Sequence, residues 1–179
     1  IITNAQLSDI IRMTLLSDCG GLWIDATVFI PNKIPEDIFK YGFYSCKRNT
    51  RDCGYVSKYQ WTSFLNGCHR KGIVQSVVKN LFFEYWKEND YLIDYLLVDY
   101  FIRLVYNNLP EARSLIDNLP YNNEKIEELQ ARMNLAFNQK KYDKLINESN
   151  TNFFKLSWRI PFDNEDKNGN MPYCGHFIN

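Results

Sequence analysis

The sequence predicts a single α/β domain. Apolar residues recur at helical spacing over 73–85 and 92–105, which predicts two core-packing helices. An apolar run over 22–30, closed by Pro31 and Asn32, predicts a strand. With 179 residues the chain is long enough for one domain with a sizeable core and too short for two full ones. Helices dominate the second half of the predicted fold.

Shorter signals predict the other elements. Thr3-x-x-Gln6 is a capping-box pattern before an apolar run, so a helix is expected to begin near Asn4. Gly20-Gly21 should end that helix, because glycine favours the backbone conformation found at helix ends. Three more elements are predicted along the chain: a short strand at 43–46, a helix over 126–137 and a last strand at 153–160.

Composition excludes some classes of protein. Lys plus Arg and Asp plus Glu both number 21, and this zero net charge argues against a nucleic-acid-binding protein. The 28 aromatic residues (12 Tyr, 12 Phe and 4 Trp) suit a thick core and flat platforms for ring-shaped ligands. Five irregularly spaced cysteines favour free thiols in a reducing cytosol over a zinc site.

One acid stands in the predicted strand and two charged residues stand in the helix before it. Asp25 interrupts the apolar run, and an ionised carboxylate there is costly unless a partner or a ligand compensates it. Asp9 and Arg12 are three apart on one helix face, and the tight turn that follows lets them converge with Asp25. Such carboxylates could hold Mg²⁺ or Mn²⁺, whereas a buried structural network would use the same residues.

Two signatures at fixed separation resemble one bacterial family. Ser8-Asp9-x-x-Arg12, followed by Gly20-Gly21-Leu22-Trp23-Ile24-Asp25-Ala26-Thr27, resembles bacterial capsular polysaccharide synthesis proteins. These are relatives of glycosyltransferase family 32 and of the sugar-transferring clostridial toxins. Phe154-Lys155-Leu156-Ser157-Trp158 resembles the family's closing K-L-[ST] segment. The resemblance implies a GT-A-like nucleotide-sugar transferase fold with a helix-rich C-terminal half.

The resemblance also implies roles for particular residues. Asp9, Arg12, Trp23 and Asp25 would contact the nucleotide-sugar donor, and Lys155, Ser157 and Trp158 would meet its diphosphate. Asp25 would act in catalysis and in metal binding. Asp94 is the second catalytic candidate, preferred over Asp99 because it would share a helix face with Tyr91 and Tyr95.

The chain departs from the wider family at the second acid of the D-x-D motif. Thr27 stands there, and a hydroxyl is a weaker ligand for Mn²⁺ or Mg²⁺ than a carboxylate. Asp94 or Asp99 could replace the missing acid, or Lys155 or Arg159 could supply positive charge to the diphosphate without a metal.

The expected activity is transfer of a sugar from a nucleotide-sugar donor to a growing capsular or cell-surface polysaccharide, with retention of anomeric configuration. Two alternatives stay open: a catalytically weak or inactive relative that binds a nucleotide or glycan, and a plain interaction domain with a buried polar network. We expect no nucleic-acid partner and a cytoplasmic location, or a peripheral one at the inner face of the cytoplasmic membrane. Because the chain begins at Ile1 with its main motif close behind, we expect residues 1–179 to be one transferase domain lacking its N-terminal part.

Overall fold

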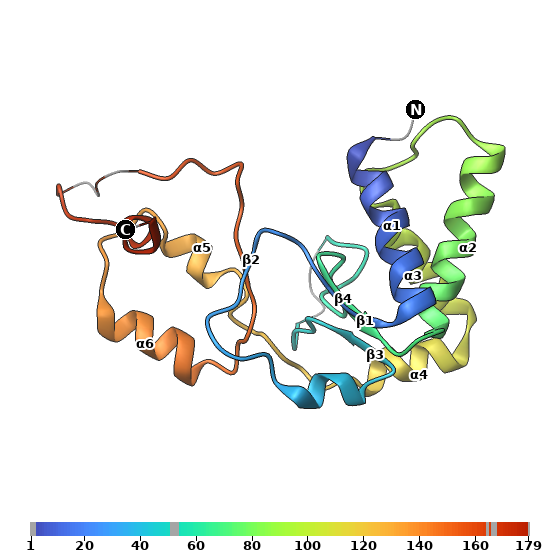
Figure 1. Ribbon diagram of the computed structural model, residues 1–179, viewed down its shortest axis with the longest axis horizontal. Helices are drawn as coiled ribbons and strands as arrows, with labels where there is room; N and C mark the ends of the chain where they lie inside the picture. The colour runs from blue at the N-terminus through green and yellow to red at the C-terminus, as the bar shows by residue number, and fades with distance from the viewer. Residues whose placement is uncertain (1–2, 51–53, 164, 166–167, 179) are drawn as a thin grey trace. The chain divides into compact units, whose positions relative to one another are not determined.

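The computed structural model describes residues 3–50, 54–163, 165 and 168–178, and the side chain of Ile178 is outside this description. It is a mixed α/β structure rich in helices, as the sequence predicts (Figure 1). The chain forms two compact units. The first comprises Ile1–Ile24 and Glu36–Tyr121, and the second comprises Asp25–Pro35 and Asn122–Asn179. The expectation of one domain lacking its N-terminal part stays a prediction.

The first unit contains four helices and a small antiparallel sheet within its described residues. The helices are α1 (Asn4–Cys19), α2 (Ile73–Glu88), α3 (Leu97–Asn108) and α4 (Pro110–Asn118), with a 3-10 turn, η1, at Glu36–Lys40. The strands β1 (Gly21–Ile24), β4 (Leu65–Cys68) and β3 (Phe43–Ser45) form a sheet in the order β1-β4-β3. Helices α1 and α2 run side by side (Figure 1). Helices, strands and a loop of this unit all contribute buried apolar side chains to its core: Met13, Leu16, Phe43, Trp61, Leu65, Val78, Phe82 and Ile102.

The Gly20-Gly21 turn fixes how α1 meets β1. The Gly20 amide donates to the Leu16 carbonyl at 2.8 Å and closes the helix. Both glycines have positive φ, 73° and 104°, which other residues rarely adopt. A Cβ on Gly20 would also lie 2.5 Å from the backbone nitrogen of Arg70. Glycine at position 20 is therefore required by both conformation and space.

The predicted strand over 22–30 is wrong as one element. It splits into β1 and β2 (Val28–Phe29), because the Val28 amide donates to the Asp25 carbonyl at 2.9 Å and forms a turn. Strand β1 pairs with β4, whereas β2 pairs with β5 (Phe154–Lys155) in a separate two-stranded sheet. Asp25 is consequently a half-buried turn residue rather than an acid inside a buried strand.

The second unit is built around β2, β5 and three helices among its described residues. These helices are α5 (Glu128–Arg132), α6 (Gln139–Glu148) and α7 (Tyr173–Ile178). Their apolar faces form a core of Leu129, Met133, Leu145, Ile146, Phe154, Tyr173 and Cys174. The Asn123 side chain accepts from the backbone nitrogens of Asn152 and Phe153, at 2.7 and 3.2 Å, and so holds the start of β5 in place.

Other predicted boundaries are partly confirmed. The helices beginning near Asn4 and spanning 73–85 are confirmed, as is the strand near 43–46. The predicted helix over 92–105 is shifted to α3, which begins at Leu97 and ends at Asn108, whereas the predicted helix over 126–137 and the predicted strand over 153–160 shorten to α5 and β5. None of the described helices combines the length and the apolar character that a membrane-spanning helix requires.

Candidate functional site

The charged pair of α1 is buried. Arg12 Nη1 lies 3.0 Å from Asp9 Oδ1, and the side chains are 5% and 12% exposed. The helical spacing of three residues puts both on the face that carries the core residues Met13 and Leu16. Burying an ion pair seldom stabilises a fold more than apolar side chains of the same size would. This pair therefore invites a functional explanation.

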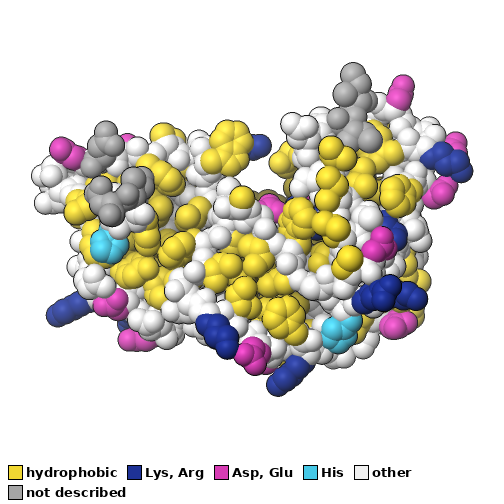
Figure 2. All heavy atoms as spheres, in the orientation of Figure 1, with side chains coloured by type: hydrophobic (Ala, Val, Ile, Leu, Met, Phe, Trp, Pro, Cys, Tyr) yellow, Lys and Arg dark blue, Asp and Glu magenta, His cyan; other side chains and the backbone are white. Residues whose placement is uncertain are grey.

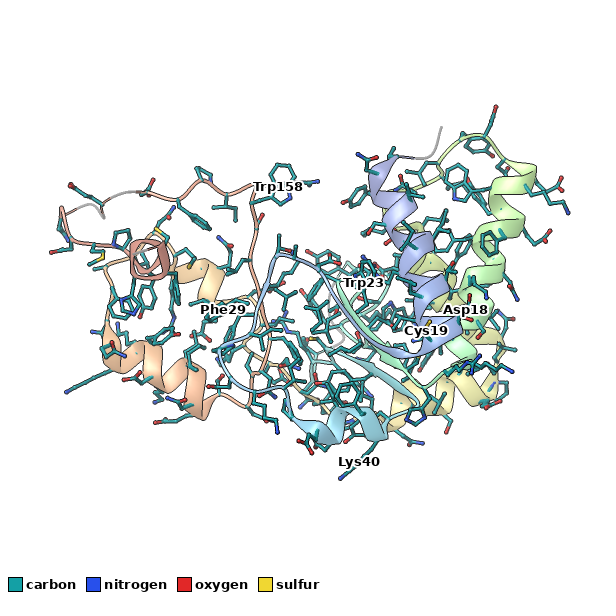
Figure 3. The ribbon with its side chains drawn as sticks, viewed as in Figure 1. Asp18, Cys19, Trp23, Phe29, Lys40 and Trp158 are labelled. Atoms are coloured by element: carbon teal, nitrogen blue, oxygen red, sulfur yellow. The ribbon has the colours of Figure 1, made fainter. Side chains whose placement is uncertain are left out.

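Trp23 provides an aromatic face for the same arginine. The Arg12 guanidinium carbon lies 5.2 Å from the centre of the Trp23 ring, within the range of a cation–π contact. Trp23 belongs to β1 and is opposite Asn66 of β4, and Figure 3 shows it beside α1. The sheet thus presents the ring to the helix that carries Asp9 and Arg12.

Asp99 of α3 is a second buried acid near Arg12, and it is only 8% exposed. Trp61 Nε1 donates to Asp99 Oδ1 at 2.9 Å. Burial raises the pKa of the Asp99 carboxyl to about 6, although the Trp61 hydrogen bond and the positive charge of Arg12 both act to lower it. One guanidinium and two carboxylates therefore share this buried cluster.

The structure removes the helix placement on which the preference for Asp94 rested. The predicted helix placement of Asp94 is wrong, because α3 begins only at Leu97 and Asp94 precedes it. Its Oδ1 accepts from the Leu96 amide at 2.7 Å, an arrangement that competes with helix formation. The face shared with Tyr91 and Tyr95 therefore does not exist. Asp99 follows the buried Leu97 and Val98 in α3, and the roles of Asp94 and Asp99 stay predictions.

Asp25 and Thr27 lie in the second unit, next to Lys155. The Lys155 ammonium donates to the Thr27 hydroxyl and, at 2.9 Å, to the Leu156 carbonyl. The Leu156 amide donates to the Thr27 carbonyl at 2.8 Å, which continues the pairing of β2 with β5. Burial lowers the pKa of Lys155, while the negative charge of Asp25 raises it.

Ser157 and Trp158 follow Lys155 in the same unit. The Ser157 amide donates to the Gln130 side chain of α5 at 2.6 Å, so this backbone is tied to a helix. Trp158 is 77% exposed, and Figure 3 shows it projecting from the chain. The Arg159 guanidinium carbon lies 5.4 Å from the centre of the Trp158 ring.

Comparison with family models shows the family to which the chain belongs. The model described as capsular polysaccharide synthesis protein matches residues 1–174. The chain belongs to this family. No match was found among curated proteins or among solved structures. Membership in this family assigns the chain a role in polysaccharide biosynthesis.

The predicted site residues of this family member fall into two groups. The first unit brings together Asp9, Arg12 and Trp23, with Asp99 added by the structure. The second unit contains Asp25, Lys155, Ser157 and Trp158. The convergence of Asp25 with Asp9 and Arg12 stays a prediction, as do the roles assigned to all of these residues.

The donor set near Asp25 does not fit a divalent cation well. Within the part of the chain that the structure describes, no group of three or more His, Cys, Asp or Glu side chains could hold a metal ion. The group around Asp25 offers one carboxylate, the Thr27 hydroxyl and the Lys155 ammonium, which repels cations. Binding of Mn²⁺ or Mg²⁺ stays a prediction. Cys19, Cys46, Cys68 and Cys174 are free thiols, and Cys53 lies outside the described residues.

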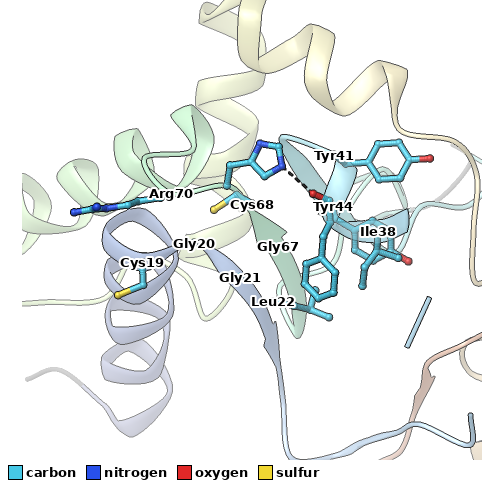
Figure 4. A pocket seen from close by; sticks show the side chains of 12 residues that line it. Cys19, Gly20, Gly21, Leu22, Ile38, Tyr41, Tyr44, Gly67, Cys68 and Arg70 are labelled. Atoms are coloured by element: carbon cyan, nitrogen blue, oxygen red, sulfur yellow. Dashed lines mark hydrogen bonds between the residues drawn. The ribbon is translucent and has the colours of Figure 1, made fainter. Parts of the chain in front are cut away.

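A pocket of about 210 Å³ opens at the Gly20-Gly21 turn of the first unit (Figure 4). Leu22, Ile38, Tyr41 and Tyr44 form its apolar wall. His69 Nε2 lies 2.9 Å from the Phe39 carbonyl oxygen, so this ring nitrogen already has a polar partner within the protein. None of the predicted site residues lines this pocket.

Proposed function

We propose that this member of the capsular polysaccharide synthesis family is a glycosyltransferase that moves a sugar from a nucleotide-sugar donor to a capsular or cell-surface glycan. The observation that carries the proposal is the buried Asp9–Arg12 pair with Trp23 against its guanidinium. Carboxylates accept hydrogen bonds from ribose and sugar hydroxyls. The Arg12 guanidinium, which pairs with Asp9 and packs on the Trp23 ring, holds the Asp9 carboxylate in a set orientation. A GT-A-like fold and a relation to glycosyltransferase family 32 belong to the same proposal.

Asp99 is proposed as a positioning residue for Arg12. Its charge acts on Arg12, and its own carboxylate is oriented by the Trp61 hydrogen bond. A guanidinium that is already held by the charges of Asp9 and Asp99 loses less conformational freedom when a ligand binds. Asp94 keeps only the role that the resemblance implies, near the acceptor.

Lys155 is proposed to meet the diphosphate of the donor, together with Ser157 and Trp158. Negative charge grows on the leaving diphosphate as the glycosidic bond breaks, and an ammonium group stabilises it. Burial lowers the pKa of Lys155, so an added anion would restore the preference for the charged form. Lys155 would thereby supply the charge that a metal supplies in relatives with two acids. Retention of anomeric configuration and action at the cytoplasmic membrane face are proposed from the resemblance.

Nucleotide binding tests the proposal. Calorimetric titration with UDP and GDP, with and without Mn²⁺, should give a binding signal that weakens about tenfold or more in Asp9→Asn. Asp18→Asn is the matched control, because Asp18 belongs to the same helix but pairs with Lys79 at the exposed surface. Absence of heat with every nucleotide, or an equal loss in both variants, would contradict the proposed site.

A second candidate is a nucleotide- or glycan-binding relative with little activity. The observation that favours it is Thr27, which accepts from Lys155 where relatives carry an acid. Release of free UDP or GDP from sugar donors, measured with and without EDTA, separates the candidates. Binding without release supports the weak relative, and release that resists EDTA supports a transferase that uses Lys155.

A further inference from the structure

A basic hollow borders α5 and α6 of the second unit. It measures about 680 Å³, and its lining includes Arg132, Lys141 and Lys144 but no carboxylate. An adjoining hollow of about 300 Å³ is lined by the same three cations, together with Lys125 and the carboxylates of Glu128 and Glu148. None of the residues proposed to bind the donor lines either hollow.

Two of these three cations, Lys141 and Lys144, are exposed lysines in no ion pair among the described residues, and the carboxylate of Glu148 follows Lys144 by one helical turn. Glu128 pairs with Arg132 and also lies 3.3 Å from the ammonium of Lys125. Among the residues that the structure describes, no carboxylate lies within 4.0 Å of the ammonium of Lys141 or Lys144. The neighbouring Asp143 accepts from the Gln139 amide group at 2.8 Å instead.

The first turn of α6 carries lysines at the end of the helix where the helix dipole is positive. Lys140 and Lys141 stand in its first turn, and that turn contains no acid. The N-terminal end of a helix carries partial positive charge, so cations are unfavourable there and anions are favourable. Lys141 and Lys144 also repel each other at a spacing of three residues. Such a conflict with local electrostatics is expected where a ligand, rather than the fold, sets the residue types.

The hollow is held by a fixed frame. The Tyr173 hydroxyl donates to the Asn138 carbonyl at 3.2 Å, and the Asn138 side chain accepts from the Lys141 amide at 3.0 Å. The rings of Phe137 and Tyr173 meet edge to face with centres 5.0 Å apart. Backbone pairing of Ala136 with Pro172 closes the same region. The cations are thus carried by a well-anchored helix end.

We propose that this hollow is a second anion site, which binds a phosphate monoester or diphosphate group. A phosphate monoester carries between one and two negative charges near neutral pH, whereas a carboxylate ligand carries one. The charge of the phosphate group is therefore the better match for the two ammonium groups of Lys141 and Lys144. Leu135, which is 57% exposed, and Phe137 add an apolar border beside the cations. The ligand would therefore carry an apolar or sugar portion next to its phosphate.

Titration with inorganic pyrophosphate tests the site. Binding to the unmodified chain should weaken about tenfold or more in Lys141→Gln/Lys144→Gln, because two charged contacts are lost. Lys140→Gln is the matched control, since Lys140 lies in the same helical turn but lines neither hollow. Lys155→Gln should keep this binding event, which separates it from the proposed donor site. Single variants at 141 and 144 replace the double variant if it does not fold.

Vesicle flotation identifies the source of the phosphate. Flotation with vesicles that contain phosphatidic acid, a lipid phosphate monoester, but not with pure phosphatidylcholine vesicles, supports a lipid headgroup if it is lost in the double variant. Pyrophosphate binding without flotation supports a soluble phosphate ester. Failure to bind either probe, or an equal loss in Lys140→Gln, would overturn the proposal.

Discussion

Asp99 offers a direct test of the buried cluster in the first unit. Burial raises its pKa from the ordinary 3.8 to about 6, so the folded chain holds a proton there that the unfolded chain has released. Between these two values the free energy of unfolding falls as the pH rises, because the unfolded state binds fewer protons than the folded state. The difference in pKa corresponds to about 3 kcal/mol, lost in full above pH 6.

Substitution of Asp99 by Asn removes this titration and keeps an oxygen that can accept from Trp61. The stability of Asp99→Asn minus that of the unmodified chain should therefore increase by about 3 kcal/mol between about pH 4 and pH 7. Urea unfolding followed by tryptophan fluorescence measures it, since three of the four tryptophans, Trp23, Trp61 and Trp86, belong to the first unit.

Asp18→Asn supplies a control with the opposite sign. The hydrogen bond from Lys79 lowers the pKa of the exposed Asp18 carboxyl, so the unmodified chain should gain stability over this variant as the pH rises. A stability difference for Asp99→Asn that does not change with pH would refute the reasoning. A change in the opposite direction would show that Arg12 holds Asp99 ionised despite its burial.

Three further predictions concern other positions. Gly20→Ala should cost about 1–3 kcal/mol from backbone strain alone, whereas Gly54→Ala, with open space around it, should leave the urea midpoint unchanged. Lys47→Met should lower the free energy of unfolding by about 3 kcal/mol or more, because the buried Lys47 ammonium donates to three carbonyls at the end of α4, each at 2.8 Å. A loss under about 1 kcal/mol would contradict this prediction. Thr27→Asp alone should not bind Mn²⁺ in a calorimetric titration, because Lys155 would pair with the new carboxylate, but Thr27→Asp/Lys155→Met should; binding by the single variant would argue against the ammonium as the obstacle.

Sequence periodicity was sufficient to predict a helix whose buried face is a single apolar stripe. Helix α2 follows directly from its apolar spacing, whereas the apolar residues Leu7, Ile11 and Leu15 of α1 are exposed, and for α1 the sequence predicted the helix but not its buried face. Helix α4 had an equally clear signal in Pro110 at its first position, and α6 had one in Asn138, whose side chain caps it. These two helices were predictable and were missed.

Pairing partners could not be predicted from periodicity. The run over 22–30 looks like one strand, yet its halves pair with β4 and with β5, and only the tertiary structure supplies those partners. In the same way, the spacing of Asp9 and Arg12 predicted their contact, whereas Trp61 and Asp99 are 38 residues apart and no local pattern joins them. Local spacing finds pairs on one element, and contacts between elements require the fold.

The antiparallel pairing of β2 with β5 has a consequence for synthesis of the chain. Val28 pairs with Lys155, so 127 residues must be translated between the two halves of this small sheet. At bacterial or eukaryotic elongation rates that interval is roughly 6 to 25 s. During this interval the backbone N–H and C=O groups of the β2 segment have no β5 strand to pair with. A nascent chain stalled before Lys155 would expose these groups to chaperones or to aggregation.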